Sequence, residues 1–171
     1  MKLTIKYQPV KRSKGLNKIY LAYGSNLNHD QMTERCPNSK FIGASFLEGW
    51  TLLFKGAATI RENEKSVVPV GLFEITQECE DSLDVFEDFP RLYDKKVVEI
   101  EFNGGKLKAM TYVMCADYGT GPPSGKYYNV IYEGYINCNL NSQYLEEAKE
   151  YAKNNDSGNS FISLRWRGEQ S

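Results

Sequence analysis

A glutamate at the end of an acidic segment is the first side chain whose position suits acid–base chemistry. Glu87 lies in LDVFEDFPRLY, and Pro90 disfavours helical geometry at the residue before it, so we place Glu87 in the last turn of a helix. The negative end of the helix dipole, the apolar Leu83 one turn earlier and the charge of Asp84 all disfavour the ionised carboxylate. These effects raise its pKa from about 4.3 toward the range useful for proton transfer at neutral pH. The alternative is a solvated acid, one of several in this segment.

The stretch YLAYGSNL, Tyr20–Leu27, is the second candidate, because a buried strand breaks there into a short polar turn. Gly24 permits positive φ and lets a ligand approach the backbone closely. Successive amides at such a turn, together with the N-terminus of a following helix, favour binding of a carboxylate or a phosphate. The alternative is structural, since a strand-to-helix turn needs small residues in any case.

The third candidate is the loop YGTGPPSGKYY, which superficially resembles a nucleotide-binding P-loop. The spacing excludes this, because Thr120 stands where the motif needs its first glycine and Tyr127 stands where it needs Ser or Thr. Pro122 and Pro123 also lack the amide donors that cradle a phosphate. We interpret the loop as a rigid pocket wall or lid that carries tyrosines, among them Tyr118.

Length and charge narrow the function classes. The 171 residues fit one domain, and the formal net charge of −1 gives no reason to expect binding to nucleic acid or to an anionic membrane. We see neither an apolar run of about 20 residues nor a secretory signal, and we expect a cytoplasmic protein. Residues 1–18 contain basic but no acidic side chains. We expect a solvated tail there, and the alternative is a basic arm that binds a polyanion.

The cysteines and the single histidine exclude other kinds of site. Cys36, Cys79, Cys115 and Cys138 are scattered, which predicts neither a zinc site nor a disulfide framework. His29 is the only histidine, so a mechanism that needs two is excluded, and we expect it on a helix surface. The sequence therefore offers no ligand cluster for a metal ion.

Hydrophobic spacing and turn residues predict more strands than helices. The predicted strands cover residues 3–10, 18–23, 40–50, 51–60, 66–75, 95–102 and 106–115. The predicted helices cover 26–36, 76–90 and 141–155, with Asn28 and Thr76 as caps. The tail, residues 156–171, is either a docked strand or a loose end. Because hairpins join the strands as often as helices do, we expect an α+β fold with a closed or nearly closed mixed sheet.

Three motifs in this order resemble the γ-glutamylcyclotransferase family, which is related to the plant avirulence-induced-gene proteins. They are Y-G-S-N-L at Tyr23–Leu27, L-D-x-x-E at Leu83–Glu87 followed by Tyr93, and P-P-S-x-x-Y at Pro122–Tyr127. The resemblance spans roughly residues 19 to 153. It implies a small β-barrel with flanking helices over residues 19–155, an N-terminal extension over 1–18 and a C-terminal tail over 156–171.

The resemblance also implies a reaction. The α-amine of a γ-glutamyl amine or peptide attacks its own γ-carbonyl, which releases 5-oxoproline and the free amine without a cofactor. Glu87 is the implied general acid and base. The implied substrate-binding residues are Tyr20, Leu21, Ala22, Tyr23, Gly24, Ser25, Asn26, Leu27, Tyr93, Tyr118 and Tyr127.

One departure and several alternatives accompany this interpretation. Asp88 stands where family members often have glycine, and a second carboxylate beside Glu87 can raise its pKa or alter what the pocket accepts. The chain can instead be a non-catalytic member that binds a γ-glutamyl or amino-acid-like ligand, or an interaction module that acts through its basic arm. The identity of the leaving amine and the choice between monomer and homodimer stay open.

Overall fold

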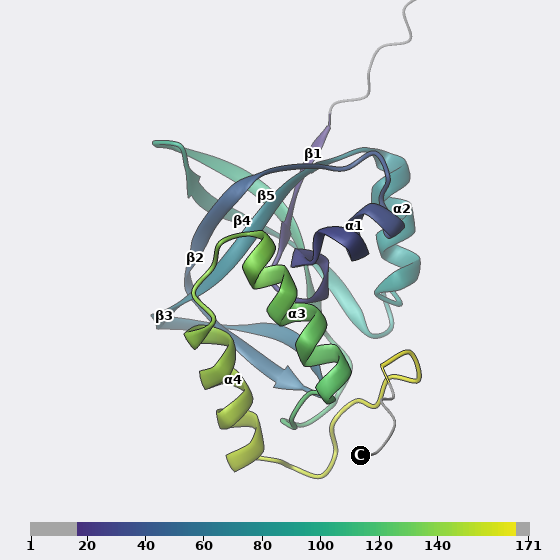
Figure 1. Ribbon diagram of the computed structural model, residues 1–171, viewed down its shortest axis with the longest axis vertical. Coiled ribbons are helices and arrows are strands. Elements are labelled where there is room, and N and C mark those ends of the chain that lie inside the picture. The colour runs from purple at the N-terminus through teal and green to yellow at the C-terminus, as the bar shows by residue number, and fades with distance from the viewer. Residues whose placement is uncertain (1–16, 167–171) are drawn as a thin grey trace, which may run out of the picture.

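The computed structural model describes residues 17–166 and contains one five-stranded mixed sheet flanked by helices (Figure 1). The strand order is β2-β3-β1-β5-β4. The strands are β1 (Lys18–Ala22), β2 (Lys40–Lys55), β3 (Ala57–Ile75), β4 (Tyr93–Phe102) and β5 (Gly105–Met114). The helices are the 3₁₀ helix η1 (Ser25–Leu27), α1 (His29–Arg35), α2 (Gln77–Phe86), α3 (Gly125–Asn137) and α4 (Gln143–Asn154).

The α+β class with a mixed sheet is confirmed, although the sheet is not closed into a barrel. β1 pairs antiparallel with β3 and parallel with β5, so the sheet is mixed. Within residues 17–166 no ladder joins the edge strands β2 and β4, which approach through the hydroxyl of Ser45 and the carbonyl of Glu101, 2.7 Å apart. A Cβ on Gly43 would lie 2.8 Å from the ring of Phe102. The Phe102 ring of β4 therefore packs closely on β2 at Gly43.

The three strands predicted between residues 40 and 75 are two long strands. β2 continues through Gly49, where φ is +80° and the pairing register shifts, and the chain turns only at Gly56, where φ is +79°. The charged residues 61–65 belong to β3. Arg61 and Glu62 pair with β2, and the side chains of 61–65 are exposed to solvent, so the strand can carry charge there. The strand predicted over 3–10 and nearly all of the basic arm lie outside the described residues.

Both predicted N-caps are confirmed. The Asn28 side chain accepts a hydrogen bond from the Gln31 amide at 3.1 Å at the start of α1. The Thr76 hydroxyl accepts one from the Cys79 amide at 3.2 Å at the start of α2. Capping of this kind satisfies amides that have no partner inside the helix.

The sequence prediction did not include α3. Its cap is Ser124, whose hydroxyl accepts from the Tyr127 amide at 3.2 Å. Its buried stripe is Tyr127, Ile131 and Tyr135, which repeat every four residues, as expected for a helix that packs on a core. The glycine-rich loop before it and the glycine within it obscured this spacing.

His29 was expected on a helix surface, and this is wrong. Its half-buried ring lies with its centroid 4.7 Å from that of Phe41, and its Nε2 is 3.6 Å from the Sγ of Cys138. Burial raises the pKa of the Cys138 thiol to about 12, so this thiol is uncharged at neutral pH. All four cysteines are free thiols.

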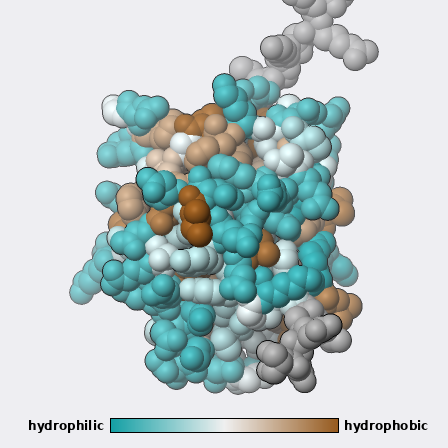
Figure 2. Space-filling view, viewed as in Figure 1, coloured by the Kyte–Doolittle hydropathy of each residue, from teal (hydrophilic) through white to brown (hydrophobic). Residues whose placement is uncertain are grey.

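The core lies between the sheet and the helices. α3 packs against η1 and α4 packs against β2, on the face of the sheet that Figure 1 presents. Figure 2 shows this face covered mainly by hydrophilic residues, with hydrophobic ones in separate groups. No helix in residues 17–166 is long and apolar enough to cross a membrane.

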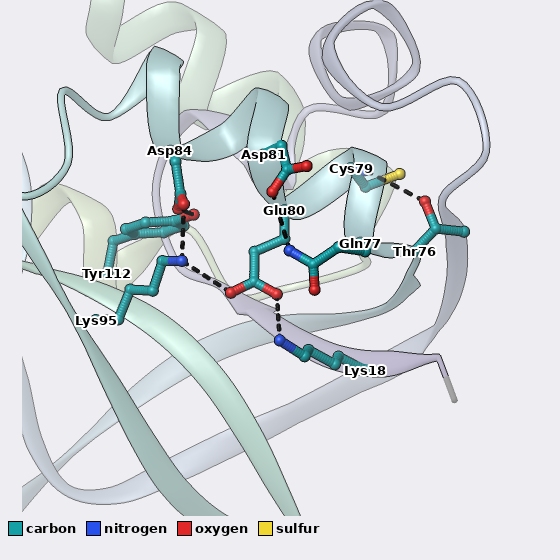
Figure 3. A network of polar contacts seen from close by, with 9 residues as sticks. All are labelled: Lys18, Thr76, Gln77, Cys79, Glu80, Asp81, Asp84, Lys95 and Tyr112. Atoms are coloured by element: carbon teal, nitrogen blue, oxygen red, sulfur yellow. Dashed lines mark hydrogen bonds and ion pairs between the residues drawn. The ribbon is translucent and has the colours of Figure 1, made fainter. Parts of the chain in front are cut away.

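A polar network holds α2 against the sheet (Figure 3). The buried Glu80 carboxylate accepts from Lys18 at 2.5 Å and from Lys95 at 2.8 Å. Asp84 accepts from the same Lys95 ammonium at 2.8 Å and from the Tyr112 hydroxyl at 2.5 Å. Burial alone would raise the pKa of Glu80, but the hydrogen bonds from both lysines outweigh it and lower this pKa. The network fixes the helix that ends next to Glu87.

Replacing Lys95 by methionine is expected to lower the free energy of unfolding by about 2–4 kcal/mol, because it leaves two acids without their shared cation. Lys95 and Asp84 are each about a quarter exposed, which keeps the loss below that of a fully buried pair. Urea unfolding at pH 7 measures it. The matched control is Lys96→Met, since Lys96 is half exposed and 3.9 Å from Glu62. Equal stability of the two variants would contradict this role.

Candidate active site

A cavity of about 640 Å³ lies where the η1 turn, the end of α2 and the start of β4 meet. This volume is typical of sites that hold a small molecule. Eight residues predicted from the sequence line it: Tyr20, Tyr23, Gly24, Ser25, Asn26, Glu87, Tyr93 and Tyr127.

Four other predicted residues do not line this cavity. Leu21, Ala22 and Leu27 are buried in the core, where they pack rather than face a ligand. Tyr118 lies on the far side of Phe161, with ring centroids 5.4 Å apart, and lines a different hollow.

Glu87 directly follows the last residue of α2, and its amide donates to the Leu83 carbonyl at 2.8 Å. Its Oε1 accepts from the Asn26 side-chain amide at 3.2 Å. Burial raises the pKa of Glu87 to about 7, although the positive charges of Arg35 and Arg165 and the Asn26 hydrogen bond act in the opposite direction. A carboxyl with this pKa can both accept and donate a proton at neutral pH.

The two neighbouring acids are paired elsewhere. Asp84, which we expected to raise the pKa of the candidate base, is bound to Lys95 and Tyr112. Asp88 lines the cavity, but both of its carboxylate oxygens accept from Arg91 at 3.0 Å. Burial therefore dominates the pKa shift.

The η1 turn brings small and polar groups close to the base. Gly24 has φ −119°, so its use lies in close approach and not in positive φ. A Cβ there would lie 3.3 Å from that of Ala58 and 3.6 Å from the Tyr127 hydroxyl. Ser25 and Asn26 are buried polar residues, and the first amides of such a turn have no acceptor within the turn.

Arg35, which sequence reasoning missed, holds this turn in place. Its Nη1 donates to the Ser25 hydroxyl at 3.1 Å and to the Asn26 side-chain oxygen, and its Nη2 donates to Gln31 at 2.7 Å. The guanidinium lies 3.1 Å from the centroid of the Phe86 ring. Burial lowers the pKa of Arg35 to about 10, so the group stays charged at neutral pH. The sequence feature that could have indicated this role is the spacing of Arg35 four residues after Gln31, because side chains at that spacing lie on the same helix face.

The tyrosine hydroxyls divide into two kinds. Those of Tyr23 and Tyr93 donate to backbone carbonyls at 2.5 Å and 2.6 Å, so their protons are already committed. Those of Tyr20 and Tyr127 accept, from Asn26 at 2.8 Å and from the Ala58 amide at 3.1 Å. Burial raises the pKa of both, so each keeps a proton that it can donate to a ligand.

A family model described as "Gamma-glutamyl cyclotransferase, AIG2-like" matches residues 20–129. The chain belongs to this family. The match includes the η1 turn, α2 with Glu87, the start of β4 and the beginning of α3. No curated protein matches the chain at a significant level.

Solved structures share the fold at low sequence identity. One named "Gamma-glutamyl cyclotransferase" has a TM-score of 0.71 and 24% identity, over 87% of this chain and 95% of that chain. An uncharacterized protein from Homo sapiens has a TM-score of 0.70 and 23% identity, over 88% and 95%. YkqA from Bacillus subtilis has a TM-score of 0.68 and 20% identity, over 80% of this chain and 54% of its own length.

Other residues that line the cavity lie outside the range that the family model matches. Residues 161–166, in the tail whose state the sequence left open, line its outer part. The described part of this tail, residues 156–166, is docked, although it forms neither a strand nor a helix. No group of three or more His, Cys, Asp or Glu side chains within residues 17–166 is arranged to hold a metal ion.

Proposed function

We propose that the chain is a γ-glutamylcyclotransferase that converts a γ-glutamyl amine or peptide to 5-oxoproline and the free amine. The observation that carries this proposal is the Glu87 carboxyl, whose pKa is raised by burial to about 7 in a cavity that also presents neutral hydroxyl donors. Membership of the family supports the same reaction. A cytoplasmic location is part of the proposal, and the free thiols agree with it.

The reaction needs proton transfer and orientation, and no water. The substrate α-ammonium gives up two protons, its nitrogen bonds to the γ-carbon, the bond to the leaving nitrogen breaks, and that nitrogen gains two protons. Glu87 takes a proton from the attacking nitrogen and returns it to the leaving one, which is worth roughly 10²–10⁴-fold in rate. Because attack is intramolecular, a well-oriented conformer contributes an effective concentration of about 10⁵–10⁸ M.

The remaining groups bind the substrate. The amides of Ser25 and Asn26 would hold the substrate α-carboxylate, which places the α-amine beside Glu87. The hydroxyls of Tyr20 and Tyr127 would donate to the γ-carbonyl oxygen as it gains negative charge. Arg35 would act through the turn that it holds and not on the reacting atoms.

The test is formation of 5-oxoproline, followed by mass spectrometry. The purified chain is incubated with glutathione, γ-glutamyl amino acids, a γ-glutamyl-lysine isopeptide and a γ-glutamyl alkylamine. We expect 5-oxoproline and free amine in equal amounts from at least one of them. A compound that raises the melting temperature without turnover would favour the non-catalytic ligand-binding alternative, and no turnover with any compound would overturn the proposed reaction.

A further inference from the structure

The C-terminal segment, residues 157–166, packs closely against three glycines. A Cβ on Gly56 would lie 1.9 Å from the carbonyl oxygen of Phe161. A Cβ on Gly119 would lie 2.2 Å from the hydroxyl of Ser157, and one on Gly121 would lie 2.4 Å from the hydroxyl of Ser160. Any other residue at these three positions would displace the segment, so the surface beneath it is shaped to receive it.

Backbone hydrogen bonds fix the segment along its length. The Ser157 amide donates to Thr120, the Gly119 amide to Asn159 and the Phe161 amide to Lys55, at 2.8, 2.8 and 2.9 Å. At its far end the Ser124 hydroxyl donates to the Trp166 carbonyl at 2.8 Å. These contacts hold residues 161–166 over the cavity as a wall.

Arg165 is the cation that this wall presents. Its Cζ lies 3.7 Å from the centroid of the Phe86 ring, while Arg35 lies 3.1 Å from the same centroid. Two guanidinium groups cannot share one face of a ring at these distances, so they occupy opposite faces. Arg35 has side-chain acceptors on the inner side, whereas Arg165 is exposed and has no side-chain acceptor or ion-pair partner within residues 17–166.

The position of Arg165 matches the outer part of a substrate. In the proposed function the α-amine lies beside Glu87 and the α-carboxylate on the η1 turn, which leaves the lining from the C-terminal segment, Arg165 included, for the leaving amine. Asp88, the acid on this rim, is neutralised by Arg91 at 3.0 Å. A guanidinium stacked on an aromatic ring has its donors pre-oriented, which suits a planar carboxylate.

We propose that Arg165 is a specificity residue that binds a carboxylate on the leaving amine, so that the chain prefers γ-glutamyl amino acids or peptides to γ-glutamyl amines without a carboxylate. This inference rests on the proposed function. It assigns selectivity to the C-terminal segment, which lies outside the residues matched by the family model.

The experiment compares γ-glutamyl-alanine with γ-glutamyl-ethylamide, whose leaving amines differ only by the carboxylate. At pH 9, where Glu87 stays ionised with or without the charge of Arg165, Arg165→Gln is expected to lower kcat/KM for the alanine compound about 10-fold, chiefly through KM, and to change that for the ethylamide less than about 2-fold. Arg165→Lys should recover part of the loss. The matched control is Arg61→Gln, an exposed arginine on β3, which should change neither.

Equal losses on both substrates would show a merely structural role, and no loss on either would also overturn the inference. Calorimetry measures binding of both compounds to the Glu87→Gln variant, with and without the additional Arg165→Gln change. Because binding needs no turnover, it tests the carboxylate site separately from the proposed reaction. If wild type forms no 5-oxoproline but Arg165→Gln still removes the preferential binding of the alanine compound, the proposed reaction is wrong and the carboxylate site is supported. If Arg165→Gln leaves binding unchanged, or neither compound binds, the carboxylate site fails.

Discussion

Replacing Glu87 by glutamine is expected to lower kcat/KM for 5-oxoproline formation at pH 8 by about 10²–10⁴-fold, the range for loss of a general acid and base. The amide keeps the shape of the side chain but cannot exchange protons. The wild-type value should rise with pH through about 7, where burial places the pKa of Glu87, and the variant should lack this limb. Unchanged turnover by the variant would exclude Glu87 as the base.

The same replacement is expected to stabilise the fold at alkaline pH. Burial raises the pKa of Glu87 to about 7, so between its ordinary value of about 4.3 and 7 the folded chain binds a proton more tightly than the unfolded chain. The free energy of unfolding of wild type therefore falls over this interval and stays lower above it. Glu87→Gln removes that loss, which amounts to roughly 1–3 kcal/mol at pH 8.

Urea unfolding of both proteins at pH 5 and pH 8 measures the effect as a difference, which cancels the other titrating groups. The advantage of the variant should be larger at pH 8. A variant that is less stable than wild type at pH 8 would mean that ionised Glu87 contributes favourable contacts that outweigh its burial.

Replacing Arg35 by methionine is expected to lower kcat/KM by about 10–100-fold, although Arg35 does not touch the reacting atoms in this account. The variant leaves the side-chain oxygens of Ser25 and Asn26 without their donor, which loosens the turn that holds the substrate head. It also removes a positive charge that lowers the pKa of Glu87. The limb of the pH profile should therefore move to higher pH as well.

The pH profile separates positioning from simple loss of structure, because unfolding lowers activity without moving the limb. Arg35→Lys should recover little activity, since one ammonium cannot reproduce a planar guanidinium that donates to three side chains. Arg61→Met serves as the control, because Arg61 is exposed on β3 and does not line this cavity. A limb that stays in place or moves to lower pH would contradict the electrostatic role.

The sequence located the parts of the cavity that follow from local chemistry. The start of the helix before Glu87 was readable from Thr76, although α2 ends at Phe86 and not near Pro90 as predicted, so Glu87 follows the helix. Its place next to an apolar face was deduced from Leu83, which is buried. The strand and turn at Tyr20–Leu27 were equally local, because a glycine and two small polar residues interrupt an apolar run.

The remaining parts depend on contacts between distant segments. Arg35 faces the turn because the short α1 folds back on it. Phe86 contacts a second cation because the C-terminal segment brings Arg165 to the last residue of α2. The docking of that segment depends on Gly56, Gly119 and Gly121, which the sequence shows only as scattered loop glycines. Barrel closure likewise depends on how the distant edge strands β2 and β4 approach each other, and no local pattern reports this.

Reaction of a turned-over γ-glutamyl amine in water enriched in ¹⁸O distinguishes cyclisation from hydrolysis. Because the substrate nitrogen, and not water, attacks the γ-carbonyl, we expect unlabelled 5-oxoproline in an amount equal to the amine released, formed about 10²–10⁴-fold more slowly with Glu87→Gln. Glutamate that carries ¹⁸O in its γ-carboxyl would show hydrolysis in place of cyclisation and would contradict the account.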